Sequence, residues 1–85
     1  MRVMEQDAKE RHDRKQAAKQ KANEIKVKGN EQFFLKNYEK ALEFYTEAIN
    51  VLRDNTVIYT NRAQCYIMMK RYEEAIEDCN WAMRV

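Results

Sequence analysis

The 85-residue sequence has no proline and a single glycine, Gly29. Both residue types interrupt helices, so their scarcity favours a chain that is helical almost throughout. No apolar run approaches the roughly 20 residues that a membrane-spanning helix needs, and the N-terminal segment lacks the apolar core of a signal peptide. We therefore expect no membrane contact and a cytoplasmic location.

Reactive and metal-binding residues are few. The two cysteines, Cys65 and Cys79, match neither the C-x-x-C spacing nor the Cys/His patterns of metal sites. Two thiols also do not make the disulfide framework of a small secreted domain, so we expect reduced, part-buried core thiols, with a disulfide or redox role as the alternative. His12 is the only histidine and has no nucleophile or phosphate-binding loop near it. The sequence therefore predicts no enzyme, no catalytic residue, no cofactor and no metal.

The residues that are abundant suit an all-α protein, since 45% are apolar and 35% are charged. The net charge of +2 is unevenly placed: residues 1–21 carry seven basic and four acidic side chains, and residues 22–85 carry nine and ten. From Glu5 to Lys21 no apolar side chain is larger than alanine, so we expect a solvated helical lead-in that continues into the first core helix. A basic arm for RNA or anionic lipid is the alternative. The interleaved acids disfavour it, so we expect no nucleic-acid partner.

A shift of 34 residues aligns the chain with itself. Residues 22–51 and 56–85 share seven identities in 30 positions. Within each unit the apolar residues recur at helical spacing, with breaks near Lys36 and Lys70. The pattern predicts a helical hairpin that occurs twice, in units at 22–55 and 56–85 after a lead-in at 1–21. The expected helices span about 5–36, 38–52, 56–69 and 72–84, and the polar stretch 54–56 supplies N-cap residues for the third.

Gly29 lies inside a helical segment, where glycine costs about 1 kcal/mol relative to alanine. We expect it to let two helices approach closely, with Ala63 in the same place in the second unit. The alanines expected opposite are Ala41, Ala48, Ala75 and Ala82, and the large side chains expected around the contact are Phe33, Tyr38, Tyr45, Tyr66 and Tyr72. On this interpretation Gly29→Ala is tolerated, whereas Gly29→Leu unfolds the first hairpin.

The 34-residue period and the residues on it resemble the tetratricopeptide repeat family. The signature positions hold Ile25, Gly29, Ala41, Tyr45 and Ala48 in the first unit and Tyr59, Ala63, Tyr66, Ala75 and Ala82 in the second. The resemblance covers residues 22–85 and implies an all-α solenoid of helix-turn-helix repeats that binds proteins. The sequence departs from the family pattern at five positions. Lys28, Gln32 and Arg62 stand where the family usually has apolar residues, Cys79 stands where it usually has an aromatic residue, and Arg53 stands where it often has proline. Because each repeat buries a face on its neighbour, we expect self-association through the uncapped last helix or marginal stability.

Two segments, IKVKGNEQFF and VIYTNRAQCY, resemble the carboxylate-clamp subtype of the family. The resemblance implies that Lys26 and Asn30, one turn apart on the first helix, join Asn61 of the third helix in binding a terminal carboxylate. The partners would be the acidic C-terminal peptides of Hsp90 and Hsp70, which would make the chain a co-chaperone adaptor. Lys and Asn are also ordinary on helix surfaces. The Asn61 side chain could instead form hydrogen bonds with neighbouring backbone groups.

The residues one turn further along would line the floor of this groove: Phe33, Gln64 and Ile67. Simple core packing is equally open for Phe33 and Ile67. The subtype also uses a Lys and an Arg from a fifth helix, which the period places beyond residue 85, so we expect the 85 residues to bind such peptides weakly or not detectably. The lead-in and the segment DCNWA most resemble a family member that acts in the cytoplasm in the assembly of axonemal dynein arms. The alternative function is a scaffold that contacts folded partners without a clamp.

Overall fold

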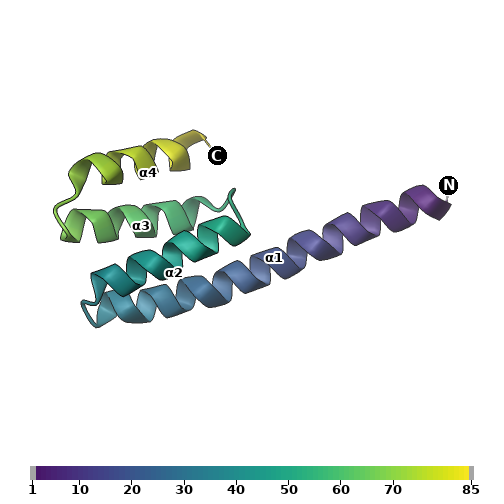
Figure 1. Cartoon of the computed structure of the whole chain (residues 1–85). Coiled ribbons are helices and arrows are strands. Elements are labelled where there is room, and N and C mark those ends of the chain that lie inside the picture. The colour runs from purple at the N-terminus through teal and green to yellow at the C-terminus, as the bar shows by residue number, and fades with distance from the viewer. Residues whose placement is uncertain (1, 85) are drawn as a thin grey trace.

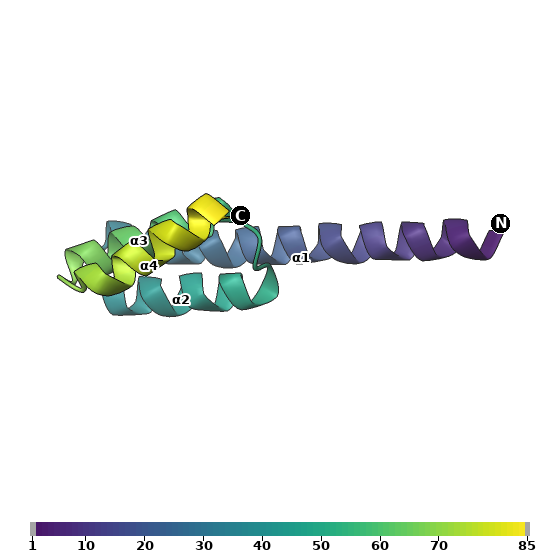
Figure 2. The ribbon, with the colours of Figure 1, turned by 90° about the horizontal axis from the view of Figure 1, so that it is seen from above.

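The computed structural model describes the backbone of residues 2–84 and the side chains of residues 14–84. Four α-helices follow one another: α1 (Arg2–Phe34), α2 (Tyr38–Val51), α3 (Thr56–Met68) and α4 (Tyr72–Arg84). They form two hairpins, α1–α2 and α3–α4, which pack side by side through α2 and α3 (Figure 1, Figure 2). The predicted all-α class is confirmed, and the helix ends lie within three residues of those expected.

The first helix is much longer than its partner. Its C-terminal part lies along α2, whereas its N-terminal part projects beyond the other helices (Figure 1). Ala18 and Ala22 pack on the hydrophobic core, so core contact begins inside the expected lead-in of residues 1–21. Lys15 also forms a 3.6 Å ion pair with Asp54 in the loop between the hairpins. The last turns of the lead-in are therefore anchored to the repeats and are not simply solvated.

Both hairpins turn through the same backbone motif. After α1, the N–H of Lys36 donates to the carbonyl of Phe33 at 3.0 Å, and the N–H of Asn37 donates to the carbonyl of Gln32 at 2.8 Å. The residue at the centre of this motif must take the left-handed conformation. Lys36 does so with φ of 65°, and Lys70 does so after α3 with φ of 63°. Glycine is the usual residue here because it has no Cβ to clash, so each lysine carries a local cost.

The loop between the hairpins ends at the N-cap of α3. Asn55 holds this position, and its side-chain oxygen accepts a hydrogen bond from the N–H of Val57 at 3.0 Å. The bond satisfies one of the N–H groups that a helix start leaves unpaired. The predicted capping by the stretch 54–56 is confirmed.

The core lies mainly between α1, α2 and α3. Its largest fully buried side chains are Tyr45 from α2 and Ile58 and Cys65 from α3. The α2 side chains that face inward recur at the spacing of one helix face: Ala41, Tyr45, Ala48 and Ile49. Burial raises the pKa of the Cys65 thiol to about 11, so the thiol stays protonated at neutral pH.

Gly29 is buried and faces the ring of Tyr45 rather than an alanine. A Cβ atom on Gly29 would lie 2.6 Å from Cε1 and 2.8 Å from Cδ1 of this ring. Tyr45 is only 1% exposed, and a close-packed interior leaves its ring little room to move aside. The expectation that alanine is tolerated at position 29 is therefore wrong. The missing side chain makes room for an aromatic ring.

The second hairpin packs differently from the first. Cys79 follows Tyr45 by 34 residues and holds the same repeat position, yet it is exposed. Tyr72 is 57% exposed, although it was expected to fill the core. Both corrections have one physical reason: α4 has its main packing partner, α3, on one side only. Both cysteines are free, as predicted, but only Cys65 is a core thiol.

We predict that Gly29→Ala lowers the free energy of unfolding by about 1–3 kcal/mol, because the new methyl group overpacks the contact with Tyr45. This loss is the net result after the roughly 1 kcal/mol that alanine gains in helix propensity. Urea unfolding measures it. The exposed neighbour serves as the control, and Lys28→Ala should change stability by less than about 0.5 kcal/mol. Equal stability of Gly29→Ala and the parent would contradict the tight contact.

We predict that Lys36→Gly stabilises the chain by about 0.5–1 kcal/mol, because glycine takes the left-handed conformation without a Cβ clash. Thermal unfolding followed by circular dichroism measures the change. Lys40→Gly is the matched control on the exposed face of α2, where glycine should instead cost about 1 kcal/mol. A loss of stability in both variants would show that the turn does not strain Lys36.

Candidate functional site

The candidate site lies where α1 and α3 pass each other. Asn30 is exposed near the end of α1, and Asn61 is half-buried in the middle of α3. Their side chains meet, since Nδ2 of Asn61 donates to Oδ1 of Asn30 at 3.3 Å. Lys26 lies one helical turn before Asn30 and is half-buried. The geometry therefore brings the two predicted asparagines together, with the predicted lysine one turn away.

The amide of Asn30 has a defined orientation. Its oxygen accepts a second hydrogen bond, from the Tyr45 hydroxyl, at 2.5 Å. An amide oxygen has two lone pairs, so these two donors occupy it fully. The NH₂ group of Asn30 is left as the outward-facing donor, and Lys26 forms no ion pair with any residue of the described part of the chain. The site thus presents one ammonium group and amide donors, which is a chemistry suited to an anion.

The three residues expected to line the groove differ in their surroundings. Phe33 is half-buried, packs against the core and contacts Tyr38 edge-to-face with ring centroids 5.4 Å apart. This contact favours the core-packing interpretation of Phe33. Gln64 is exposed and Ile67 is 48% exposed, so both are accessible on α3.

A shallow apolar depression beside Asn30 was not predicted. It has a volume of about 450 Å³, and its lining includes the exposed Val27, Phe34 and Leu35. The signal was present in the sequence, because FF at positions 33 and 34 cannot both face the core of one helix. Its other lining residues are Asn30 and Glu31, so it adjoins the candidate site.

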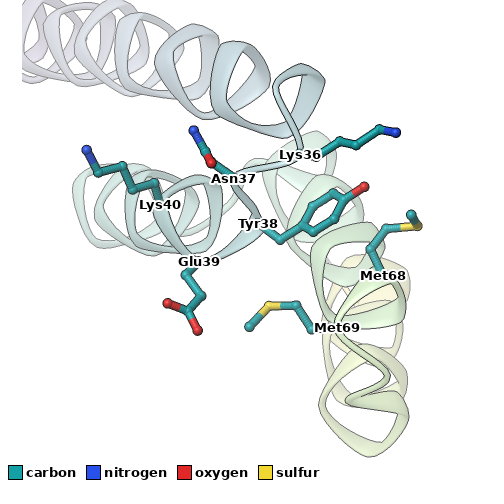
Figure 3. Close-up of a pocket in the computed structure, with 7 residues that line it drawn as sticks. All are labelled: Lys36, Asn37, Tyr38, Glu39, Lys40, Met68 and Met69. Carbon is teal, nitrogen blue, oxygen red and sulfur yellow. The ribbon is translucent and has the colours of Figure 1, made fainter.

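A hollow of about 690 Å³ lies at the turn of the first hairpin, between the α1–α2 turn and the end of α3 (Figure 3). Its residues are Lys36, Asn37, Tyr38, Glu39, Lys40, Met68 and Met69. Lys36 and Lys40 point away from each other, so they do not form a cluster (Figure 3). None of the predicted site residues lines this hollow.

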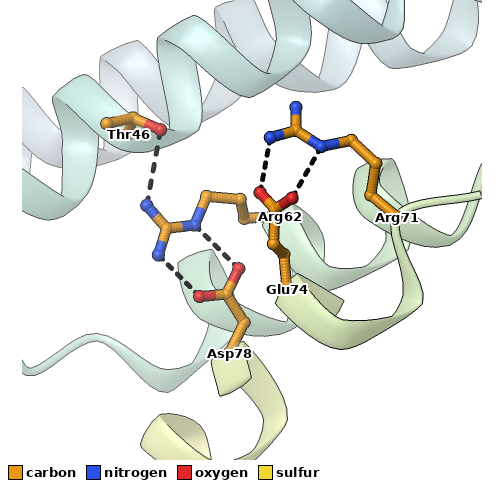
Figure 4. Close-up of polar contacts among 5 residues, drawn as sticks. All are labelled: Thr46, Arg62, Arg71, Glu74 and Asp78. Carbon is orange, nitrogen blue, oxygen red and sulfur yellow. Dashed lines mark hydrogen bonds and ion pairs between the residues drawn. The ribbon is translucent and has the colours of Figure 1, made fainter. Parts of the chain in front are cut away.

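A buried ion pair holds α3 beside its neighbours. Arg62, the residue after Asn61, donates two hydrogen bonds to the Asp78 carboxylate of α4, at 2.7 and 2.6 Å (Figure 4). It also donates to Thr46 Oγ1 of α2 at 3.4 Å. The bonds to Asp78 raise the pKa of the Arg62 guanidinium above its ordinary value. Arg62 therefore links α2, α3 and α4, and its fork geometry restricts how α3 can rotate.

The sequence indicates one partner of this ion pair, Arg62, but not the other. Arg62 departs from the apolar residue usual at its position, and a charged side chain in a core needs a partner. Asp78 as that partner follows only from the packing of α4. The Arg62 guanidinium also lies 5.8 Å from the ring centroids of Tyr59 and of Tyr66.

The described residues contain no group of three metal-ligating side chains placed to hold an ion. Within residues 2–84, no helix combines the length and apolar character that crossing a bilayer requires.

Comparison with known sequences identifies the family. Sequence models of the tetratricopeptide repeat match residues 27–55 and residues 57–85. The chain belongs to the tetratricopeptide repeat family. The two matched segments lie within the two predicted units, so the tetratricopeptide repeats correspond to the hairpins α1–α2 and α3–α4.

Relatives among tetratricopeptide repeat proteins are similar over most of this chain but are far longer. Tetratricopeptide repeat protein 12 of Homo sapiens is 47% identical over 81 residues, which is 95% of this chain and 12% of that protein. Heat shock protein STI1 of Saccharomyces cerevisiae is 40% identical over 65 residues, which is 75% of this chain and 11% of that protein. The chain thus spans about an eighth of these relatives.

A solved tetratricopeptide repeat structure shares the arrangement of helices. The first TPR of Spaghetti (RPAP3), bound to the HSP90 peptide SRMEEVD, superimposes with a TM-score of 0.76 and 38% sequence identity. The similarity covers 76% of this chain and 52% of that chain. The likeness of this chain to repeats found in co-chaperones is therefore seen in both sequence and fold.

We predict that Asp78→Ala lowers the free energy of unfolding by about 3 kcal/mol, because it leaves the mostly buried Arg62 guanidinium without its partner. Urea unfolding measures this loss. The matched control is Glu77→Ala, which removes an exposed carboxylate one residue away and should cost less than about 0.5 kcal/mol. Replacing both partners with apolar residues, as Arg62→Met with Asp78→Leu, should recover most of the loss. Similar losses in Asp78→Ala and Glu77→Ala would contradict the role of the pair.

Proposed function

We propose that this chain binds the free C-terminal carboxylate of acidic peptides from Hsp90- and Hsp70-type chaperones and so acts as a co-chaperone adaptor. The observation that carries the proposal is the contact between Asn30 and Asn61, with Lys26 one turn away on α1. Hydrogen bonds from ammonium and amide donors to a carboxylate are charge-assisted and stronger than neutral ones. The function needs no cofactor and no catalytic residue.

The relatives support this choice of partner. The RPAP3 repeat binds an HSP90 peptide that ends in Glu-Glu-Val-Asp, and this chain is 38% identical to it. The peptide offers two carboxylates at its last residue, one from the side chain and one from the chain end. Lys26 and the two asparagines have the right chemistry for one such terminal group.

We also propose a cellular setting for this adaptor, and it rests only on sequence similarity to one relative. Similarity to tetratricopeptide repeat protein 12 favours a cytoplasmic role in the assembly of axonemal dynein arms. The match covers 12% of that relative's length.

A scaffold that contacts folded proteins without a clamp is the second candidate. The exposed side chains of α4 favour it, since they include large apolar groups on a surface helix: Tyr72, Ile76, Trp81 and Met83. The same surface would support self-association of the 85 residues. In this case Lys26, Asn30 and Asn61 would be dispensable for partner binding.

We predict that SRMEEVD binds the chain weakly, with a dissociation constant of about 1 mM, because only three groups contact the carboxylate. Titration followed by nuclear magnetic resonance should show the largest shift changes at the side-chain amides of Asn30 and Asn61. Asn30→Ala and Asn61→Ala should each weaken binding by about 1.5–3 kcal/mol, the usual loss for a hydrogen bond to a charged group.

Two controls accompany this titration. Asn50→Ala removes an exposed asparagine from α2 and should leave binding unchanged. The same peptide with an amidated C-terminus should bind at least about tenfold more weakly, because the site donates its hydrogen bonds to a charged terminal carboxylate. Equal binding of the two peptides, or unchanged binding after both site substitutions, would favour the scaffold.

A further inference from the structure

We infer that Tyr45 is a positioning residue for the candidate site: its buried hydroxyl holds the Asn30 amide with its NH₂ group facing the peptide, and Gly29 provides the space for the Tyr45 ring. The inference rests on the proposed function, because it names what orients one of the three peptide-binding groups. It assigns a binding role to a core side chain that does not itself reach the peptide.

The position of the ring is set by α1. Tyr45 projects from α2 toward Gly29, where a Cβ would lie 2.6 Å from its Cε1 atom and 3.1 Å from its Cζ atom. The Cζ atom carries the hydroxyl, so any side chain at position 29 would push this group as well as the ring. Asn30 is the next residue along α1, and its side-chain oxygen receives that hydroxyl.

The hydrogen bonds of Asn30 determine which amide atom faces outward. Its oxygen accepts from the Tyr45 hydroxyl at 2.5 Å and from Nδ2 of Asn61 at 3.3 Å. Turning the amide by half a rotation would aim its NH₂ group at the NH₂ group of Asn61 and would expose the oxygen. An exposed amide oxygen repels a carboxylate, whereas an exposed NH₂ group donates to it.

Tyr45 is a dependable donor for this purpose. Its side chain is 1% exposed, so water does not compete for the hydroxyl. Burial, with a smaller contribution from Cys65, raises the pKa of Tyr45 to about 12. The hydroxyl therefore keeps its proton throughout the neutral range. Asn30 itself is exposed, and without this bond its two side-chain torsions would be held by Asn61 alone.

The first measurement needs no peptide. Nitrogen relaxation of the Asn30 side-chain amide should give an order parameter near that of rigid backbone, about 0.85, in the parent chain. In Tyr45→Phe, which removes only the hydroxyl oxygen, we expect it to fall below about 0.6. Tyr59→Phe is the matched control, because Tyr59 is also buried and its hydroxyl has no hydrogen bond among the described residues. An unchanged order parameter in Tyr45→Phe would overturn the inference.

The second measurement uses SRMEEVD. Tyr45→Phe should weaken binding by about two- to tenfold, the range expected for one neutral hydrogen bond. Tyr59→Phe should bind as the parent does. In an Asn30→Ala background, Tyr45→Phe should leave the initial slope of the Asn61 amide shift against peptide concentration unchanged, because the group that it orients is gone. An equal loss in both backgrounds would show that Tyr45 acts through general stability, and would overturn the positioning role.

A further variant keeps the inference testable if Tyr45→Phe fails to fold. Asn30→Asp retains an oxygen that accepts from both Tyr45 and Asn61, but it presents a second oxygen outward. At neutral pH we expect it to fold and to bind SRMEEVD at least about tenfold more weakly. Binding equal to the parent would overturn the assigned orientation. If the parent itself binds no peptide, the proposed function fails, while the relaxation measurement still decides whether Tyr45 orients Asn30.

Discussion

The Tyr45 ring lies against bare helix backbone at Gly29, and the first hairpin depends on this contact. A Cβ on Gly29 would lie 2.6 Å from the ring, so no other residue type fits there without displacing it. The helix gives up about 1 kcal/mol of propensity, and burial of a whole aromatic side chain, which contributes about 1.5–3 kcal/mol, more than offsets it. The same ring carries its hydroxyl to Asn30. Core packing and the candidate site therefore share one side chain.

The second hairpin contains a largely buried ion pair between its two helices. Arg62 and Asp78 are joined by two hydrogen bonds of 2.7 and 2.6 Å in a largely buried setting. A buried ion pair adds little net stability relative to apolar residues, because desolvation cancels most of the attraction. The planar fork of Arg62 does impose geometry, and Asn61 precedes it on α3. Arg62 also donates to Thr46 Oγ1 of α2 at 3.4 Å, which ties α3 to the first hairpin.

The candidate site is small and open. One ammonium group and two amides lie at the surface of α1 and α3, and the hollow of about 690 Å³ is elsewhere. A terminal carboxylate needs no deep cavity, since recognition comes from a few oriented donors. With a single positive charge available from Lys26, the direction of each amide decides whether the site attracts or repels an anion.

The sequence by itself determined the all-α class, both turns, a capping residue within 54–56 and the family. These features depend on a 34-residue period, helical spacing and residue types that can be recognised along the chain without knowledge of its packing. It also indicated which residues of α1 and α3 approach each other. It did not determine which side chain fills the space at Gly29, which acid pairs with Arg62, or that Cys79 is exposed while Cys65 is buried. These outcomes depend on ångström-scale distances between residues 15 or more positions apart, and only the packing of the helices decides them.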